Sequence, residues 1–142
     1  MQLVTADKIA AVMGLAQAPQ SMAGLEALVA RGLPKSALKA SVDHLEQSPA
    51  ERRALLYRII PEATYKRRRD RLTPEESERA ERLARTFATA QHVWNSDEDA
   101  LSFLHTRNRS LQGRTPLEVS MSELGARRVE QLLWQIFYGL GA

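Results

Sequence analysis

Residues 73–94 read TPEESERAERLARTFATAQHVW, and this stretch carries the longest helical pattern in the chain. Thr73 precedes Pro74 and Glu76, an arrangement in which the threonine hydroxyl and the glutamate carboxylate cap the first turn of a helix reciprocally. The apolar side chains that follow recur at helical spacing: Ala80, Leu83, Ala84, Phe87, Ala88 and Trp94. Such a stripe predicts that one face of a helix over residues 74–94 packs into a core. We expect this helix to link two halves of the chain.

Helix signals recur on both sides of this stretch, whereas strand signals are nearly absent. The capping pattern of Thr73–Glu76 is repeated at Ser48–Glu51 and at Thr115–Glu118. Further helices are expected near residues 5–13, 22–31, 34–46, 49–58, 61–70, 97–105, 116–120 and 123–138. Residues 106–114, which contain Asn108, Ser110 and Gly113, are expected to form a loop. The sequence therefore predicts an all-α protein.

The composition narrows the class of protein. The 142 residues are 44% hydrophobic and 26% charged, as in folded soluble proteins, and they include no cysteine, which excludes disulfides and thiolate metal sites. No stretch is long and apolar enough to span a membrane, and the N-terminal residues make a poor signal peptide. We therefore expect a cytoplasmic protein without a membrane partner.

The basic residues are concentrated in the centre of the chain. Residues 52–85 hold 11 of the 20 lysines and arginines against 6 of the 17 acidic residues, while the segments on either side are slightly acidic. A local basic patch indicates a polyanionic partner more strongly than the small net charge of +3 does.

Residues 51–71, ERRALLYRIIPEATYKRRRDR, predict two short helices with a tight connection at Arg58–Pro61. In a helix-turn-helix the second helix enters the major groove of DNA, where cations hold phosphates or guanine edges. The candidate DNA-binding residues are Thr64, Tyr65, Lys66, Arg67, Arg68 and Arg69. The alternative is that this run is an ordinary solvated face. Residues 22–45 also have helix-turn-helix length, but they lack a basic second helix and are interpreted as scaffold or dimer surface.

The last predicted helix has an apolar face and, opposite to it, a side that carries aromatic residues. At 100° per residue, Val129, Leu132, Leu133 and Ile136 share one face and are expected to pack inward. The opposite side carries an arginine, a glutamate and three aromatic residues, the types that anchor protein interfaces. With the apolar tail, the candidate partner-binding residues are Arg127, Glu130, Trp134, Phe137, Tyr138 and Leu140. The alternative is that this helix is buried on all sides.

Motifs for catalysis are missing from the sequence. His44, His92 and His105 lack metal-ligand spacing, and neither a glycine-rich phosphate loop nor a nucleophile motif occurs. We therefore expect neither an enzyme nor a metal or cofactor site.

A set of short motifs nevertheless marks residues 82–142: Arg82-Leu83-Ala84, Ala100 with Phe103-Leu104, Asn108 through Leu111, Gly113-Arg114-Thr115-Pro116-Leu117, Gly125-Ala126 with Val129, Leu132-Leu133, Ile136 and Tyr138-Gly139. In this order and spacing they resemble the toxin-binding domain of the Xre/MbcA/ParS antitoxin family. A second set is similar to the helix-turn-helix that precedes this domain in the same family: Ile60-Pro61 with Thr64, Arg67-Arg68, Arg71-Leu72 and Glu76-Ser77.

The resemblance implies the antitoxin of a type II toxin–antitoxin system. The usual partner of this family is a RES-domain toxin that consumes NAD+, whose active site the antitoxin blocks, and the antitoxin represses its own operon by binding promoter DNA. The implied architecture is a Cro/C1-like helix-turn-helix region over residues 1–72 and a toxin-binding domain over residues 73–142. We expect a homodimer, because helix-turn-helix proteins usually bind two half-sites. The alternatives are a stand-alone transcriptional regulator with a C-terminal dimerisation or partner-binding domain, and an interaction module that does not bind DNA.

Overall fold

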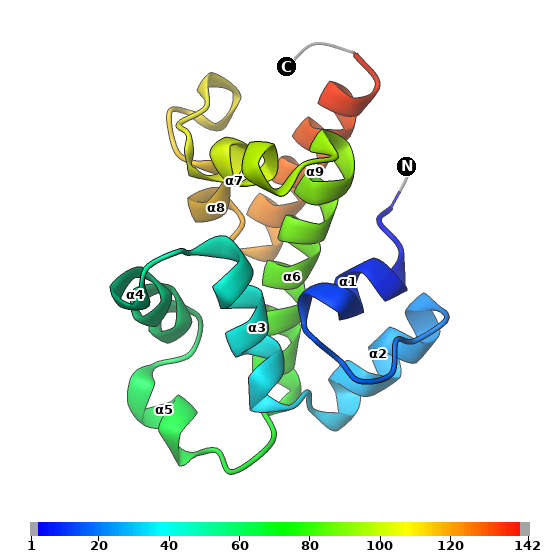
Figure 1. Cartoon of the computed structure of the whole chain (residues 1–142), viewed down its shortest axis with the longest axis vertical. Coiled ribbons are helices and arrows are strands. Elements are labelled where there is room, and N and C mark those ends of the chain that lie inside the picture. The colour runs from blue at the N-terminus through cyan, green and yellow to red at the C-terminus, as the bar shows by residue number, and fades with distance from the viewer. Residues whose placement is uncertain (1–2, 140–142) are drawn as a thin grey trace. The chain divides into compact units, whose positions relative to one another are not determined.

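A computed structural model describes residues 3–139 of the chain, and Figure 1 shows its helices. They are α1 (Ala6–Val12), α2 (Met22–Arg31), α3 (Lys35–Leu45), α4 (Pro49–Ile59), α5 (Glu62–Arg67), α6 (Pro74–Trp94), α7 (Asp97–His105), the 3-10 helix η1 (Arg109–Leu111), α8 (Pro116–Val119) and α9 (Glu123–Phe137). Within residues 3–139 the only β-type pairings are two isolated bridges, Pro34 with Arg71 and Asn108 with Arg114. The prediction of an all-α fold is confirmed.

The chain divides into two compact units, and the division lies inside α6. The first unit is Thr5–Ala84, and the second consists of the residues from Arg85 onward together with Leu3 and Val4. Each unit therefore contains one half of the long helix.

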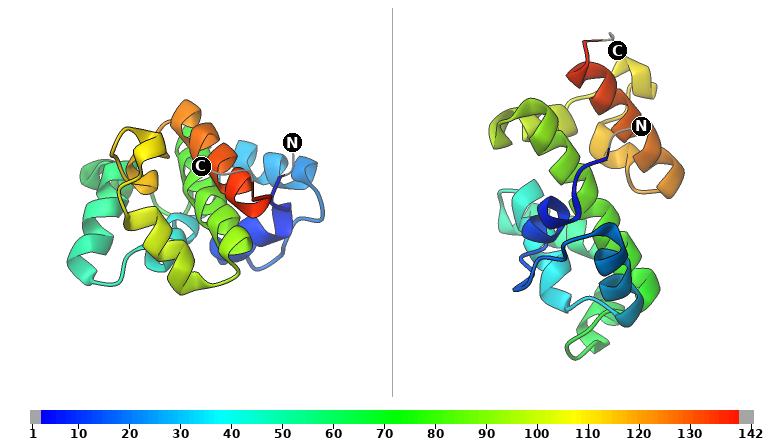
Figure 2. Two further views of the ribbon diagram at one scale, coloured as in Figure 1. Left: turned by 90° about the horizontal axis from the view of Figure 1, so that it is seen from above. Right: turned by 90° about the vertical axis from the view of Figure 1, so that its right-hand side faces the viewer.

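The Thr5–Ala84 unit is organised around α3. The helix α3 contacts α1 on one side and α4 on the other, α1 also contacts α2, and α4 contacts α5. Figures 1 and 2 show α3 beside the first half of α6, where the Ser77 hydroxyl accepts a hydrogen bond from the Leu33 amide at 2.7 Å. Ile9, Leu38 and Leu45 are fully buried, so α1 and α3 pack through their apolar faces.

The turn between α2 and α3 holds the segment that follows α5. Gly32 has φ +94°, and a Cβ there would collide with the carbonyl oxygen of Leu72, so the backbone of the two segments meets at a distance that only glycine allows. The Leu72 amide donates to the Leu33 carbonyl at 2.8 Å, and the Lys35 amide donates to the Asp70 carbonyl at 2.9 Å. The segment after α5 is thus fixed to this turn by main-chain hydrogen bonds.

The unit that begins at Arg85 contains the second half of α6 with α7, α8 and α9. The helix α8 contacts both α7 and α9, and Figure 2 shows α9 running beside the second half of α6. Where α8 gives way to α9, Gly125 is buried and a Cβ would collide with the carbonyl oxygen of Val119. This close approach explains why a glycine stands in the first turn of α9.

Four predictions need correction. The helix expected over residues 61–70 ends at Arg67, because the backbone is extended at Arg68. Residues 109–111 of the expected loop form the helical turn η1. Ser48 caps α4 through the Glu51 amide at 3.1 Å, but the Glu51 carboxylate accepts from the Ser48 hydroxyl at 3.2 Å instead of reaching the cap amide. Trp94, expected in the core, is 36% exposed because it is the last residue of α6.

Candidate DNA-binding and partner-binding surfaces

The helices α4 and α5 form the pair that the sequence predicts for DNA binding. They are joined by Ile60 and Pro61 alone, and the Ile60 side chain is fully buried. Both connecting residues have negative φ angles, −135° and −52°, so this turn does not need the glycine that is common in helix-turn-helix motifs.

The six candidate DNA-binding residues fall into two groups. Lys66, Arg67 and Arg69 are exposed. Thr64, Tyr65 and Arg68 are half-buried. The first group therefore faces solvent, whereas two members of the second group are engaged within the protein.

Arg68 forms a salt bridge with Glu76 at the start of α6. Its Nε and one terminal nitrogen donate to the two Glu76 carboxylate oxygens at 2.9 and 2.8 Å. The carboxylate, whose side chain is only 7% exposed, also accepts from the Thr73 amide at 2.9 Å. These hydrogen bonds, that of Arg68 above all, lower the pKa of Glu76 to about 2 despite its burial. The predicted capping box at Thr73 is thus formed, and it includes an arginine from the basic run.

Tyr65 is held by Lys35 of α3 and by Tyr57 of α4. The Lys35 ammonium lies 4.3 Å from the centre of the Tyr65 ring, and the phenol donates to the Lys35 carbonyl at 3.4 Å. The Tyr57 and Tyr65 rings meet edge to face at 6.3 Å. Burial raises the pKa of the Tyr65 phenol. This residue therefore attaches α5 to the rest of its unit.

The exposed cations differ in how strongly they are engaged. Lys66 pairs with Glu62 one turn earlier at 2.6 Å, and this contact raises the pKa of Lys66, although such an exposed pair contributes little to stability. Neither Arg67 nor Arg69 forms an ion pair with any of residues 3–139. Their guanidinium groups can therefore reach an anionic partner without breaking an internal contact.

The side of α9 that was expected to pack inward does so. Val129 and Leu133 are fully buried, Leu132 is 4% exposed and Ile136 is half-buried. The expectation of an outward-facing opposite side is wrong at two positions, because Trp134 is 7% exposed and Glu130 is 9% exposed.

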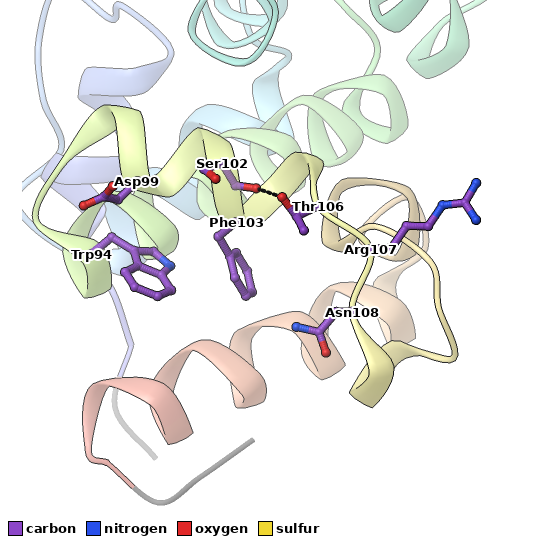
Figure 3. A pocket seen from close by; sticks show the side chains of 7 residues that line it. All are labelled: Trp94, Asp99, Ser102, Phe103, Thr106, Arg107 and Asn108. Carbon is purple, nitrogen blue, oxygen red and sulfur yellow. Dashed lines mark hydrogen bonds between the residues drawn. The ribbon is translucent and has the colours of Figure 1, made fainter.

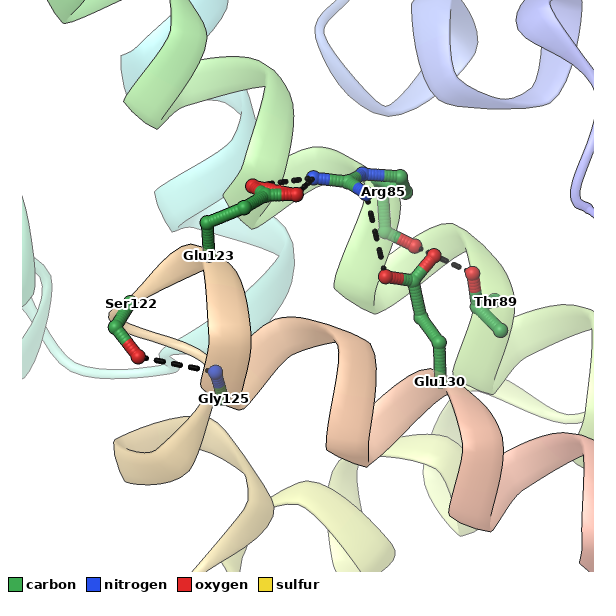
Figure 4. Close-up of polar contacts among 6 residues, drawn as sticks. All are labelled: Arg85, Thr89, Ser122, Glu123, Gly125 and Glu130. Carbon is green, nitrogen blue, oxygen red and sulfur yellow. Dashed lines mark hydrogen bonds and ion pairs between the residues drawn. The ribbon is translucent and has the colours of Figure 1, made fainter.

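These two side chains are buried because they contact the second half of α6. The Trp134 ring lies 5.5 Å from the imidazole of His92, measured between ring centres. Glu130 accepts a hydrogen bond from Arg85 at 3.3 Å, and Glu123 pairs with the same guanidinium at 3.3 Å (Figure 4). Burial raises the pKa of Glu130 while Arg85 opposes that shift. Arg85 therefore joins α9 to α6 at two points along the helix.

The end of α9 exposes two aromatic side chains. Phe137 is 44% exposed and Tyr138 is 54% exposed. Their rings meet edge to face at 5.1 Å, and both also contact the buried Trp134, at 5.4 and 6.3 Å. Arg127 is exposed nearer the start of the helix, and Leu140 lies outside the described residues. An aromatic surface is thus supported from behind by a packed tryptophan.

The same unit contains a shallow pocket of about 380 Å³ along α7 and the segment that follows this helix (Figure 3). Its lining residues are Trp94, Asp99, Ser102, Phe103, Thr106, Arg107 and Asn108. The rings of Trp94 and Phe103 lie 6.0 Å apart, and the Thr106 hydroxyl donates to the Ser102 carbonyl at 2.6 Å. The helical pattern predicted Trp94 in the core, but its ring lies at the surface. Its position at the very end of a helix was the signal in the sequence that could have indicated this exposure.

Comparison with protein families matches one domain model to each half of the chain. Residues 24–85 match the Antitoxin Xre-like helix-turn-helix domain, and residues 89–139 match the Antitoxin Xre/MbcA/ParS C-terminal toxin-binding domain. A search of curated proteins gives no match. A helix-turn-helix followed by a toxin-binding domain defines a DNA-binding antitoxin of a toxin–antitoxin system. The chain belongs to the Xre/MbcA/ParS family of these antitoxins, as its motifs predicted.

Two kinds of feature are missing from residues 3–139. None of the helices within residues 3–139 has the length and apolar character needed to cross a bilayer. The same residues contain no group of three or more acidic or histidine side chains arranged to hold a metal ion.

Proposed function

We propose that this antitoxin neutralises a RES-domain toxin that degrades NAD+, and that it does so by covering the active site of the toxin. The match to a toxin-binding domain gives the class of partner, and the motifs of residues 82–142 resemble those of antitoxins whose usual partner is a RES toxin. The observation that carries the proposal is the pair of exposed aromatic residues, Phe137 and Tyr138, at the end of α9. Covering a site requires only burial and shape, so the antitoxin itself catalyses no reaction.

The candidate toxin-binding residues have different roles in this proposal. Arg127, Phe137 and Tyr138 contact the toxin directly, as does Leu140 in the tail. Trp134 and Glu130 are buried against α6 and act from behind by fixing the position of α9. Exposed aromatics on a rigid support lose little conformational entropy on binding, which favours high affinity.

For DNA, we propose that α5 binds the promoter of its own operon, with Lys66, Arg67 and Arg69 at the phosphates and Thr64 at a phosphate or base edge. The support is the match to an antitoxin helix-turn-helix domain together with the exposure of these cations. Two copies of the chain bind two half-sites, as helix-turn-helix proteins usually do. An antitoxin that represses its own operon in this way works in the cytoplasm. The functional division into residues 1–72 and 73–142 remains a prediction.

The test is a neutralisation assay with the toxin encoded beside the antitoxin gene. Inducing that toxin alone is expected to stop growth and lower cellular NAD+, and co-expression of the antitoxin is expected to restore both. The F137A/Y138A double variant is expected to restore neither. A toxin that stops growth while NAD+ stays constant would contradict the RES assignment.

A matched control comes from the other end of the same helix. Leu124 is 71% exposed, so L124A also removes exposed apolar surface, but it lies about 20 Å along the helix axis from Phe137 at 1.5 Å per residue. This variant is expected to neutralise the toxin far better than F137A/Y138A does, because Arg127, one turn away, is the only proposed contact residue near Leu124. Equal loss in L124A and F137A/Y138A would contradict the proposed location of the contact.

A further inference from the structure

The four arginines of the segment Arg67–Arg71 have two different environments. Arg67 and Arg69 are exposed and form no ion pair within residues 3–139. Arg68, which is half-buried, and Arg71, which is exposed, instead donate to groups of their own unit. We infer that Arg67 and Arg69 bind DNA phosphates, and that Arg68 and Arg71 are positioning residues that hold α5 in place without touching DNA. This inference rests on the proposal that α5 faces DNA.

Arg71 helps to attach this segment to the turn between α2 and α3. Its guanidinium donates to the Gly32 carbonyl at 2.7 Å, and the Lys35 ammonium donates to the Arg68 carbonyl at 3.1 Å. The main-chain hydrogen bonds of Asp70 and Leu72 to Lys35 and Leu33 act between the same two segments. Because α5 has only six residues, it depends on such tertiary contacts for its position.

Arg68 attaches the same segment to α6. Its partner Glu76 is buried, so moving the guanidinium to a phosphate would leave a carboxylate without its main compensating charge. Breaking a buried pair in this way is costly, since the remaining charge stays out of water. The Arg68 backbone is extended, at φ −70° and ψ 137°, so the helix ends there. The Arg68 side chain therefore points in a different direction from that of Arg67, which is still helical.

The two roles differ in their salt dependence. Each cation that neutralises a phosphate adds about 0.9 to the slope of log affinity against log salt concentration, because it releases condensed counterions. A positioning residue leaves this slope unchanged, although its loss weakens binding at every salt concentration. The slope of log affinity against log salt concentration therefore distinguishes a residue that contacts DNA from a positioning residue, whereas a single affinity does not.

The experiment compares full-length variants on a duplex of the upstream promoter across a potassium chloride series. R68M/E76Q removes both charges of the pair and keeps the net charge of the protein, and the introduced glutamine retains an acceptor for the Thr73 amide. We expect an unchanged slope and roughly tenfold weaker binding at each salt concentration, about 1.4 kcal/mol. R67M and R69M are each expected to lower the slope by about 0.9.

R71M provides a second, independent variant, because it changes the net charge as R67M does but leaves the Arg68–Glu76 pair intact. Its slope is expected to equal that of the wild type. A slope that falls by about 0.9 in either R68M/E76Q or R71M would overturn the inference, as would unchanged affinity in both. Circular dichroism and toxin binding, expected to match the wild type, show that the variants are folded. A wild-type affinity that does not respond to salt would instead overturn the proposed DNA interface itself.

Discussion

Trp134 and Phe137 are adjacent aromatic residues of α9 with different predicted roles. Trp134 is 7% exposed and contacts the rings of His92, Phe137 and Tyr138, so W134A leaves a cavity inside the unit that begins at Arg85. Replacing a buried tryptophan by alanine usually costs about 3 to 5 kcal/mol. We expect a loss of that size in the free energy of unfolding of this unit.

Phe137 should behave in the opposite way. It is 44% exposed, which for a side chain of roughly 200 Å² leaves about 90 Å² to be buried by a partner. At about 25 cal/mol per Å², F137A is expected to lose about 2 kcal/mol of toxin affinity, or roughly thirtyfold. Its cost in stability should be below that of W134A, because the solvent already reaches almost half of the ring.

Urea unfolding and toxin titration of both variants provide the assay. Trp94 lies in the same unit and is the only other tryptophan of the chain, so its fluorescence still reports unfolding in W134A. After correction for the folded fraction, W134A is expected to lose less toxin affinity than F137A does, because Trp134 acts on the toxin only through the rings that it supports. A W134A variant of normal stability that binds the toxin weakly would refute this reasoning, because Trp134 would then be a contact residue.

Two further predictions concern stability. The folded pKa of Glu76, about 2, lies below its ordinary value of 4.5. The stability that this carboxylate contributes is therefore present above pH 5 and lost as the pH falls toward 2, and we expect it to be about 1 to 2 kcal/mol after solvent screening. E76Q, compared with the wild type by urea unfolding at pH 7 and pH 3, should lack this acid-sensitive part of the stability. A methyl group at Gly125 would collide with the Val119 backbone, so G125A should destabilise its unit by about 3 kcal/mol or more. G24A is the control, because the nearest atom to its Cβ would be the Pro19 Cβ at 3.2 Å, and it should change the unfolding midpoint little. A fully stable G125A would contradict this packing.

Local signals were sufficient to predict where most helices begin. Hydroxyl residues cap the first turns of α4, α7, α8 and α9 through hydrogen bonds to amides three residues later. These contacts lie within four residues of sequence, so they can be read without knowing the fold. The end of α5 could not be read in this way, because Arg68 leaves the helix to pair with Glu76, eight residues away.

The candidate surfaces were predictable in type but not residue by residue. A basic run and an aromatic helix end are visible in the sequence, yet Arg68 and Trp134 are engaged inside their units. Periodicity divides a helix into faces, but it does not say how many faces have neighbours. On α9 the neighbouring α6 covers Glu130 and Trp134 of the side expected to face outward, and only the end of the helix exposes aromatic rings.

We propose that DNA binding and toxin neutralisation depend on separate surfaces, one on α5 and one at the end of α9. The most direct test measures the affinities of R67A/R69A and F137A/Y138A for both the promoter duplex and the toxin. We expect R67A/R69A to lose promoter affinity while retaining toxin affinity, and F137A/Y138A to show the reverse. If either variant lost both affinities to the same extent while remaining folded, the two functions would share a surface and the account would be wrong.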